Sequence, residues 1–395
     1  MGAFKVIVLV WSSLLLGVPA LLFAIGYVPE NMENRSRSPM PAFSPGSLVD
    51  TGYYADLARH LSDYLPMRSL AIRADSAIDL WLFSDSPTSS VVKGRDGWFF
   101  ARESVVSDCL GEDERSRFQA DRVTSLAQFL AAGNTRLLVA VVPDKESVYP
   151  EYLSGIARMG ARCGDATREY LRRVLADTGD VYLDVFSLLE RHRASPDHIP
   201  LYSPLDTHWT TYGSGLFAEQ FVKATEPWSL VDARLERPGN DTGGGELSRM
   251  MAVDLPDTRG GRYIWSRPGV REGDNHVIPH GGRGEAYRLF GGVAEGSARL
   301  SDMKVVVIHD SFIYYTWDHL ARFFETALYV HWGVVDNPEV AGFMSDADIV
   351  LIESAERFAF DRFVTFFSPA TLAKLKEAEG SAEWEQMRAK VNRRQ

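Results

Sequence analysis

Short, almost unbroken runs of Val, Leu and Ile constrain the fold of this chain more than any other feature. Segments with helical periodicity separate them. The runs are residues 136–142, 181–185, 303–308, 327–331 and 349–352, and the helical segments are 117–132, 167–176, 211–225 and 314–324. Strands of a parallel sheet that are buried on both faces have this composition and are joined by helices. The pattern therefore predicts an α/β domain with a central, mostly parallel sheet between two helical layers.

The N-terminus carries a second constraint. After Lys5 the chain has no charged residue from Val6 to Pro29, and most of these residues are apolar. About 20 apolar residues in a helix span a bilayer, so this segment is long enough for a membrane anchor. A cleaved signal peptide is the alternative, with the small residues Ala24 and Gly26 at its cleavage site. Both interpretations export the remainder of the chain.

These features divide the chain into predicted regions. The region after the apolar segment is rich in Pro, Ser, Asn and Arg and is expected to be a linker, whereas the last residues form a charged helix. Within the domain we expect helix over 53–82 with a break at Pro66, and an insertion rich in Gly and Arg. The predicted regions are 1–29 (anchor or signal), 30–50 (linker), 51–370 (α/β domain, insertion at about 236–296) and 371–395 (helical tail).

Charge and cysteine content exclude some functions. The formal net charge is −11, which argues against nucleic acid as a partner because phosphate is repelled. Cys109 and Cys163 are the two cysteines. In an exported protein we expect them to form one disulfide, with two free buried cysteines as the alternative. No Cys/His spacing typical of zinc is present, so neither a metal nor a cofactor is expected.

A candidate nucleophile follows one of the apolar strands. The sequence Val305-Val306-Val307-Ile308 runs directly into His309-Asp310-Ser311 and then into a predicted helix. A serine in this position projects from the carboxyl edge of the sheet, where its own backbone N–H and the helix dipole stabilise an oxyanion. The alternative is that Asp310 or Ser311 only caps the helix.

A candidate base lies about a hundred residues earlier. Asp206 and His208 stand two apart, in the segment Tyr202-Ser203-Pro204-Leu205-Asp206-Thr207-His208-Trp209. A serine hydroxyl needs a base, and a carboxylate beside a histidine fixes its tautomer. Extended backbone turns residues i and i+2 to the same side, so the two side chains are expected to meet. Trp209 is interpreted as a core residue or as a platform for a sugar ring.

Taken together, these motifs resemble the alginate O-acetyltransferase family, whose domain is similar to SGNH hydrolases. The resemblance spans roughly residues 50–365, and the order of the blocks is more specific than any single block. The blocks are Asp63–Arg68, Lys93–Phe100, Val142–Lys145, Tyr149–Tyr152, Asp206–Trp209, Gly245–Met251, Asp310–Phe312, Asp348–Glu353 and Glu356-Arg357. Two departures stand out: His309 replaces the usual glycine, and the Asp-His block precedes the serine.

The resemblance implies an SGNH-like fold and assigns three roles. Ser311 is the nucleophile, His208 the base and Asp206 its orienting acid. It also implies transfer of acetyl groups to an exported polysaccharide, with a membrane-bound O-acyltransferase as the partner that supplies acetyl, at the periplasmic side of the inner membrane. Candidates for contact with the substrate are Trp209, Tyr202, Lys145 and Tyr149.

Three functions remain open from the sequence. An O-acetyltransferase and a carbohydrate acetylesterase share the acyl-serine step, and they differ in whether a sugar hydroxyl or water resolves it. A scaffold that binds glycan without chemistry is the third. The presence of Ser311, His208 and Asp206 together argues against the scaffold, because a binder does not need all three. The identity of the polysaccharide is not encoded in these motifs.

Overall fold

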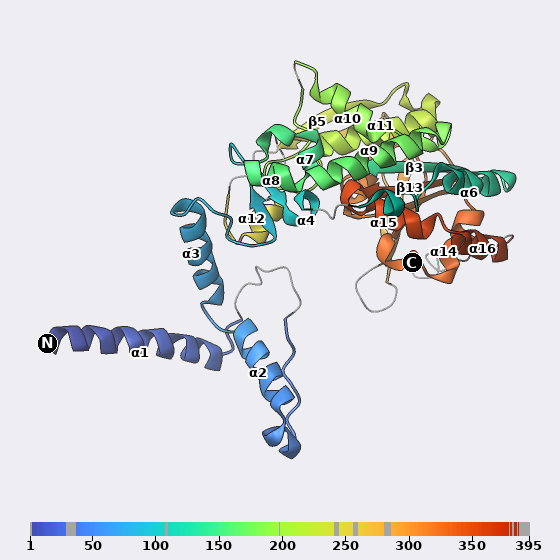
Figure 1. The fold of residues 1–395 in the computed structure, drawn as a ribbon. Helices are drawn as coiled ribbons and strands as arrows, with labels where there is room; N and C mark the ends of the chain where they lie inside the picture. Colours follow the sequence, from blue (N-terminus) through green and yellow to red (C-terminus); the bar gives the residue numbers. More distant parts are fainter. Residues whose placement is uncertain are drawn as a thin grey trace. The chain divides into compact units, whose positions relative to one another are not determined.

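The computed structural model describes residues 2–28, 37–106, 110–196, 198–240, 245–255, 260–279 and 286–378, with residues 380, 383, 384 and 386 of the tail. The chain divides into two compact units (Figure 1). One comprises residues 1–93 and 244–256, and the other residues 94–243 and 257–395. The region boundaries expected from the sequence stay a prediction.

The first unit is mainly helical. It contains α1 (Gly2–Ala24), α2 (Thr51–Asp63), α3 (Arg68–Trp81), α12 (Glu246–Met250), the 3₁₀ helix η1 (Pro45–Val49) and strand β1 (Val91–Lys93). The Asp50 carboxylate caps α2 by accepting a 2.8 Å hydrogen bond from the N–H of Gly52. The two helices predicted over 53–82 are therefore confirmed, with the break around Pro66.

Helix α1 has the properties of a membrane span. Its residues Phe4–Ala24 have a mean hydropathy of 2.5, and none of this window is buried in the protein. At 1.5 Å per residue the helix is long enough to cross the hydrocarbon layer. By length and composition, the predicted N-terminal membrane segment is helical and apolar enough to span, as either an anchor or a signal segment would be.

The second unit is built around a seven-stranded sheet with the order β4-β3-β13-β11-β12-β9-β8. The first five strands in this order are parallel, and β9 and β8 run antiparallel to their neighbours. The mostly parallel sheet expected from the sequence is confirmed. The strands are β3 (Arg136–Val142), β4 (Tyr182–Leu183), β8 (His276–Pro279), β9 (Ala286–Phe290), β11 (Val305–His309), β12 (Ala327–His331) and β13 (Ile349–Ala355).

Helices cover both faces of this sheet. Helices α10 (Val185–Arg193) and α11 (Thr211–Thr225) lie on the opposite side of β3 and β13 from α15 (Glu356–Phe366) and α16 (Pro369–Glu377) (Figure 1). Other helices of the unit are α4 (Arg102–Val105), α5 (Glu112–Arg115), α6 (Ala120–Ala132), α7 (Lys145–Val148), α8 (Gly155–Gly160), α9 (Arg162–Ala176), α13 (Trp317–Leu320) and α14 (Pro338–Ser345).

The core explains why the apolar runs form central strands. Val139, Val306 and Ile308 pack in one large cluster with α6, α9 and α14–α16. The alternate residues, among them Leu138 and Val307, point to the other face and are equally buried. Burial of each such side chain contributes about 1.5–3 kcal/mol, so no position on these strands favours a polar residue for stability.

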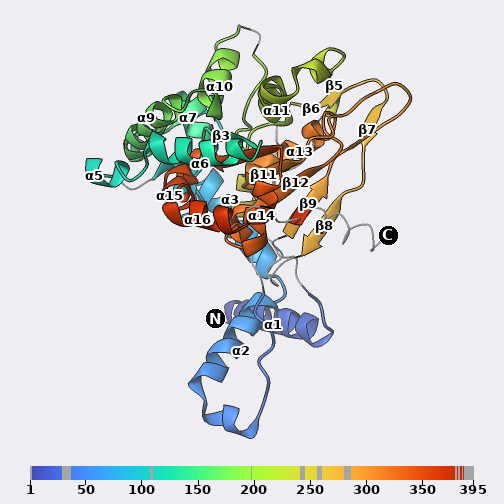
Figure 2. The same cartoon turned by 90° about the vertical axis from the view of Figure 1, so that its right-hand side faces the viewer.

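The segment predicted as an insertion contains strands. They are β5 (Arg234–Asn240), β6 (Gly261–Ser266), β7 (Val270–Glu272) and β10 (Gly292–Ala294), in addition to β8 and β9. β5 pairs with β6 and β10 with β7, whereas β8 and β9 extend the main sheet next to β12 (Figure 2). Part of this segment is thus continuous with the α/β core. The weak periodicity of its sequence gave no sign of these strands.

One helix prediction and one strand prediction need correction. The helix expected at 314–324 is instead the 3₁₀ helix η5 (Ser311–Tyr315) followed by the short α13. Tyr314, Tyr315 and Trp317 have low helix propensity, which disfavours a longer α-helix here. The strand expected at 181–185 ends at Leu183, because the Asp184 carboxylate accepts a hydrogen bond from Ser187 and caps α10.

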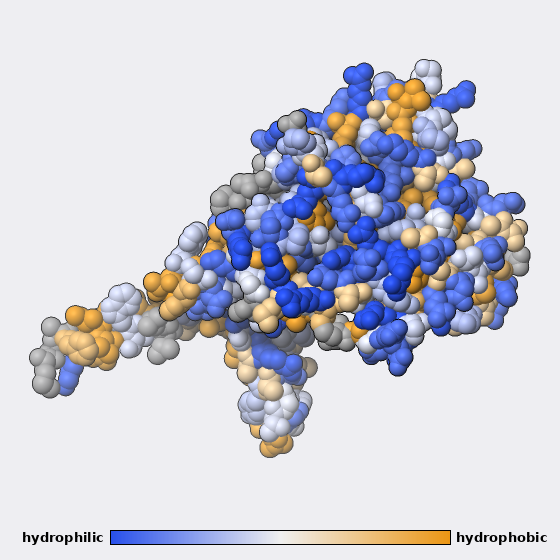
Figure 3. Space-filling view, turned by 45° about the horizontal axis from the view of Figure 1, so that its top comes forward, coloured by the Kyte–Doolittle hydropathy of each residue, from blue (hydrophilic) through white to orange (hydrophobic). Residues whose placement is uncertain are grey.

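The tail and the surface complete the description. Helix α16 covers the beginning of the charged helix expected at 371–395, and the rest of that helix stays a prediction because most residues after α16 lie outside the described residues. In the view of Figure 3 the surface of the second unit is mainly hydrophilic, with scattered apolar side chains. The unit also contains β2 (Phe99–Ala101) and the 3₁₀ helices η2 (Pro150–Tyr152), η3 (Gly179–Val181), η4 (Pro227–Leu230) and η6 (Trp332–Val334).

Candidate active site

Ser311 lies at the carboxyl end of the central strand β11. The strand is buried throughout and ends at His309, and Ser311 is the first residue of η5. Ligands of open parallel sheets bind at this edge. Because η5 is a five-residue 3₁₀ helix, the helix-dipole contribution expected from the sequence is reduced to that of a single short turn. The backbone turn itself stays in the predicted place.

Asp310 holds the turn that presents Ser311. Its carboxylate accepts hydrogen bonds from the N–H groups of Phe312 (3.1 Å) and Ala355 (2.7 Å) and pairs with the Arg362 guanidinium at 2.7 Å. Burial opposes ionisation of Asp310, but the Arg362 charge and the two N–H donors outweigh it and lower the pKa of the carboxyl. Asp310 is therefore an ionised structural residue, and the capping role left open in the sequence belongs to it.

A second carboxyl lies behind the same turn. The Glu353 side chain is fully buried on β13 and accepts a 3.1 Å hydrogen bond from the N–H of Asp310. Burial, reinforced by the Asp310 charge, raises the pKa of Glu353 well above its usual range. Two buried carboxyl groups, Asp310 and Glu353, therefore hold the turn that presents Ser311.

Asp206 and His208 meet at a tight bend. The Asp206 carboxylate accepts hydrogen bonds from both the backbone N–H of His208 (3.0 Å) and its Nδ1 (2.9 Å). The sequence argument assumed extended backbone, and this is wrong: the side chain bonds its own backbone two residues on, as in an Asx turn. The two side chains still meet as expected, because the same carboxylate oxygen receives both donors.

The structure brings the three predicted residues together. His208 Nε2 lies 2.8 Å from Ser311 Oγ, on the ring edge opposite Asp206. A carboxylate only accepts, so Nδ1 carries the hydrogen and Nε2 is the acceptor for the serine O–H. This is the hydrogen-bond order of a serine nucleophile, its base and the orienting acid. Phe312 and Tyr315 flank the imidazole ring, with ring centroids 5.0 Å and 5.3 Å away.

A buried lysine supports the Asp206 bend. Lys145 is 2% exposed, and its ammonium group donates to the carbonyl oxygens of Ser203 (3.1 Å), Pro204 (3.2 Å) and Asp206 (2.7 Å). The same ammonium group lies over the aromatic rings of Trp98 and Phe100. Lys145 therefore fixes the backbone that carries the acid.

The aromatic candidates for substrate contact are also internal. Tyr202 donates to the carbonyl oxygen of Pro143, Trp209 donates to that of Phe312 at 3.0 Å, and the Tyr149 hydroxyl accepts from the N–H of Leu201 at 3.0 Å. Each of the three side chains is at most 4% exposed. Contact of these residues and Lys145 with substrate stays a prediction. Their burial favours a role in positioning the loop 202–209, which carries Asp206 and His208.

Close packing explains the sequence after this loop. Tyr202 and Trp209 form an antiparallel bridge that closes it, and the Thr210 hydroxyl caps α11. A Cβ atom at Gly213 would approach the carbonyl oxygen of Leu201 to 2.9 Å, so α11 packs against the loop only with glycine there. The rigid element that follows thus fixes the His208 bend.

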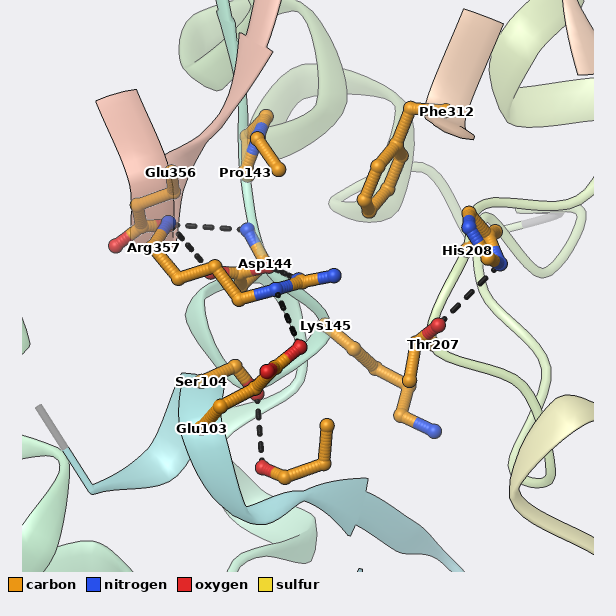
Figure 4. Close-up of polar contacts among 12 residues, drawn as sticks. Glu103, Ser104, Pro143, Asp144, Lys145, Thr207, His208, Phe312, Glu356 and Arg357 are labelled. Atoms are coloured by element: carbon orange, nitrogen blue, oxygen red, sulfur yellow. Dashed lines mark hydrogen bonds and ion pairs between the residues drawn. The ribbon is translucent and has the colours of Figure 1, made fainter. Parts of the chain in front are cut away.

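A charged cluster borders the site on the other side (Figure 4). Arg357 pairs with Asp144, and its Nε lies 3.3 Å from the Glu103 carboxylate. The Phe312 ring separates Arg357 from His208 in Figure 4 and contacts both. Burial raises the pKa of the neighbouring Glu146 to about 7. The family blocks contained Asp144 and Arg357, but no sequence signal indicated Arg362 or the burial of Glu146.

The predicted disulfide cannot be placed. Cys163 lies in α9, whereas Cys109 lies outside the described residues. The bridge between them therefore stays a prediction.

Comparison with known protein families agrees with the sequence resemblance. Residues 91–246 match a family model described as an SGNH hydrolase-like domain of the acetyltransferase AlgX. The match contains Asp206 and His208 and ends before Ser311. The resemblance to the alginate O-acetyltransferase family is confirmed. The α/β fold described above is thus SGNH-like.

Relatives named "Probable alginate O-acetylase AlgJ" extend this similarity. The protein from Azotobacter vinelandii is 26% identical over 173 residues, which are 44% of this chain and 43% of the relative. The protein from Pseudomonas aeruginosa is 24% identical over 243 residues, or 60% of each chain. The chain thus aligns with about half the length of these relatives.

Two solved structures are similar at low identity. The O-acetyltransferase domain of Pseudomonas putida AlgJ has a TM-score of 0.47 and 17% identity, covering 73% of this chain and 99% of that one. Bacillus cereus PatB1 with a sulfonyl adduct has a TM-score of 0.48 and 12% identity, covering 69% and 98%.

Proposed function

We propose that this protein is an O-acetyltransferase that moves acetyl groups onto hydroxyls of an exported polysaccharide through an acetyl-serine intermediate on Ser311. The observation that carries the proposal is the unbroken hydrogen-bond series from Asp206 through His208 to Ser311, at 2.9 Å and 2.8 Å. Structural capping does not require this series, because Asp310 already caps η5.

The proposed reaction has two steps. In the first, Ser311 Oγ attacks the carbonyl carbon of an acetyl ester while His208 Nε2 takes the serine proton. The tetrahedral intermediate collapses, and the donor alkoxide leaves with the proton from His208. In the second, a sugar hydroxyl gives its proton to His208 and attacks the acetyl-serine. Collapse of that intermediate returns the proton to Ser311 and releases the acetylated sugar.

Asp206 and the serine backbone support these steps. The carboxylate keeps Nδ1 protonated and stabilises the imidazolium that forms in each step. The N–H of Ser311, at the start of η5, is the proposed donor to the oxyanion. Tyr315, stacked on the imidazole, restricts its rotation.

The names of the relatives support a choice of acceptor, and the donor is proposed from the family resemblance. Alginate is the first acceptor to test, since the relatives aligned above are named alginate O-acetylases. A membrane-bound O-acyltransferase is the proposed source of acetyl groups. The alternative is an acetylesterase with the same residues, in which water replaces the sugar hydroxyl. A glycan-binding scaffold without chemistry is the third candidate.

Incubation of the full chain in detergent with an acetyl-ester donor and oligosaccharides tests the proposal. Mass spectrometry of sugar and protein is expected to show acetylated sugar and an acetylated serine peptide. Acetate release without acetylated sugar would favour the esterase. No consumption of donor by a folded chain, with its acceptor present, would favour the scaffold.

We further propose that the domain lies in the periplasm, attached to the inner membrane by α1 or released after cleavage. Export predicts that Cys109 and Cys163 are oxidised to one disulfide. Thiol labelling of denatured, unreduced protein purified from the periplasm is expected to modify neither cysteine. Two labelled thiols would contradict the bridge and leave the acyl-transfer proposal unaffected.

A further inference from the structure

His309, which stands where the motif usually has glycine, is a buried polar residue at the end of β11. The rest of this strand is Val-Val-Val-Ile, and every residue of the strand is at most 3% exposed. Burial lowers the pKa of His309 from 6.5 to about 4, so the ring is neutral near pH 7. A buried imidazole needs hydrogen-bond partners that an aliphatic side chain does not, so stability of the core alone does not favour histidine here.

The imidazole of His309 binds the peptide group on the C-terminal side of Asp310. Its Nδ1 lies 2.6 Å from the carbonyl oxygen of Asp310. A carbonyl oxygen only accepts, so Nδ1 is the protonated nitrogen of the neutral ring. The N–H of Ile313 donates to the same oxygen at 3.3 Å, so the ring provides the shorter of the two bonds. His309 therefore fixes the orientation of the peptide between Asp310 and Ser311.

The same peptide carries the N–H of Ser311. A trans peptide group is planar, so its C=O and its N–H point in opposite directions. A bond that fixes the carbonyl of Asp310 consequently fixes the direction of the Ser311 N–H. Among the residues that the structure describes, this N–H has no hydrogen-bond acceptor, whereas the next one, of Phe312, is bonded to the Asp310 carboxylate. The Ser311 N–H is thus available to an oxyanion on the carbon that Ser311 Oγ attacks.

Three other rings hold the imidazole of His309 in place. The rings of Tyr314, Tyr329 and His331 meet it edge to face, with centroids 5.7 Å, 5.9 Å and 5.9 Å away. His331 also pairs in register with His309 on the neighbouring strand β12. Close packing of this kind restricts rotation of the ring, so Nδ1 stays directed at the carbonyl before any reaction begins. Donors that are oriented in advance do not have to reorganise when charge develops.

We propose that His309 is a positioning residue for the oxyanion: its bond to the Asp310 carbonyl directs the Ser311 N–H at the oxyanion and strengthens it as a donor. The N–H becomes a stronger donor because a hydrogen bond accepted by an amide oxygen polarises the whole amide group. His309 itself does not touch the reacting atoms. The inference rests on the proposed function, because it concerns the acyl-serine step in which Oγ bonds the ester carbon, its proton moves to His208 and the ester oxygen becomes the oxyanion.

The alternative role of His309 is packing between β11 and β12. Packing requires the volume of the side chain, whereas positioning requires a hydrogen-bond donor at Nδ1. Two substitutions separate these requirements. His309→Asn retains a donor, because the side-chain amide nitrogen occupies the position of Nδ1. His309→Leu retains most of the volume and removes the donor.

The rate of the first acyl transfer to Ser311 measures the effect. The full chain in detergent is mixed with 4-nitrophenyl acetate, and the first turnover is followed by release of nitrophenolate and by the mass of the protein. His309→Leu is expected to lower the maximal rate about 10- to 100-fold, somewhat less than the loss of a whole oxyanion donor, and to leave the half-saturating ester concentration unchanged. His309→Asn is expected to recover most of the rate.

A thiono ester makes the test specific for the oxyanion. In 4-nitrophenyl thionoacetate, sulfur replaces the carbonyl oxygen and accepts hydrogen bonds weakly, so acylation depends less on the Ser311 N–H. We expect His309→Leu to slow the oxygen ester more than the thiono ester, whereas partial unfolding slows both equally. His60→Leu is the matched control, because Nδ1 of His60 in α2 also donates to a backbone carbonyl, that of Ser38, at 2.9 Å. This variant is expected to leave both rates unchanged.

Three results would overturn the inference. They are an unchanged maximal rate in folded His309→Leu, equal slowing of the two esters by this variant, and equal rates for His309→Leu and His309→Asn. If His309→Leu does not fold, His309→Gln replaces it, because the glutamine amide lies one bond farther from the backbone than Nδ1. Acylation of Ser311 that depends on His309 in this way, without transfer of the acetyl group to any sugar, would contradict only the proposed function.

Discussion

The ammonium group of Lys145 lies 2.7 Å from the backbone carbonyl oxygen of Asp206, inside the protein. A buried cation requires acceptors, and the three carbonyls of the 203–206 segment supply them. The relationship is reciprocal, because the same bonds hold the segment in the bend that orients Asp206 towards His208. One buried side chain thus connects the stability of the loop to the geometry of the site.

Lys145→Met tests this connection. The variant removes the charge and leaves three buried carbonyls without their donor, so the free energy of unfolding is expected to fall by about 3 kcal/mol. Acetyl transfer is expected to fall further than the loss of folded protein explains, because Asp206 is no longer held. Urea unfolding and transfer by the folded fraction measure the two effects. Lys374→Met is the control, since Lys374 is half-exposed and should change stability by less than about 0.5 kcal/mol.

Glu146 predicts a loss of stability as the pH rises from acidic to neutral. Burial raises the pKa of Glu146 to about 7, from a usual value of 4.5. The folded state therefore keeps a proton that the unfolded chain releases, and stability decreases as pH rises from about 4.5 to about 7. Glu146→Gln is expected to be more stable than the wild type above pH 7, by at most about 3 kcal/mol, and equal to it below pH 4.5. Urea unfolding at pH 4.5, 6 and 8 measures the difference.

Glu151→Gln is the control for this series, because it removes the same charge from a partly exposed side chain. If Glu146→Gln changed the free energy of unfolding by the same amount at every pH, the prediction would be contradicted. Glu146 would then be ionised in the folded protein over the whole range.

His319 predicts the opposite dependence at acidic pH. Burial lowers the pKa of His319 from 6.5 to about 3. Its Nδ1 accepts from the N–H of Trp265 and its Nε2 donates to the carbonyl oxygen of Thr211. The unfolded chain binds a proton that the folded protein does not, so stability decreases as pH falls from about 6.5 to about 3.

His319→Gln should reduce this acid sensitivity. The amide retains one donor and one acceptor, so we expect the variant to be less stable than the wild type by about 1–3 kcal/mol at pH 7. Between pH 6.5 and pH 4.5 the free energy of unfolding should decrease less in the variant than in the wild type. His198→Gln, at an exposed position, should leave the wild-type curve unchanged. Parallel curves for His319→Gln and the wild type would contradict the assignment of the slope to His319.

The sequence predicted the central sheet because burial on both faces leaves a simple pattern. The uninterrupted runs around Val139, Val306 and Val350 correspond to strands at the centre of the sheet. Residues at the sheet edge leave a weaker pattern. The antiparallel strand β8 carries His276 and Pro279, and its place beside β9 depends on pairing with a distant segment.

The site residues also divide into those that the sequence predicts and those that only the fold reveals. Asp206, His208 and Ser311 were predicted because their residue types and local context limit their chemistry. Arg362 was missed, since its pairing with Asp310 depends on how α15 packs against the end of β11. Lys145 was expected to contact substrate, and only the fold reveals that three backbone carbonyls surround its ammonium group.

The acyl-enzyme is the most direct test of the account. The full chain is incubated with an acetyl-ester donor without acceptor, quenched in acid and digested, and the peptides are analysed by mass spectrometry. We predict one added acetyl group on the peptide containing Ser311, and its absence in Ser311→Ala. His208→Ala should reduce the rate of labelling by orders of magnitude, and Asp206→Ala somewhat less, since the residues act as a unit. Equal acetylation of a folded Ser311→Ala protein, or donor turnover that leaves Ser311 unmodified at all times, would contradict the account.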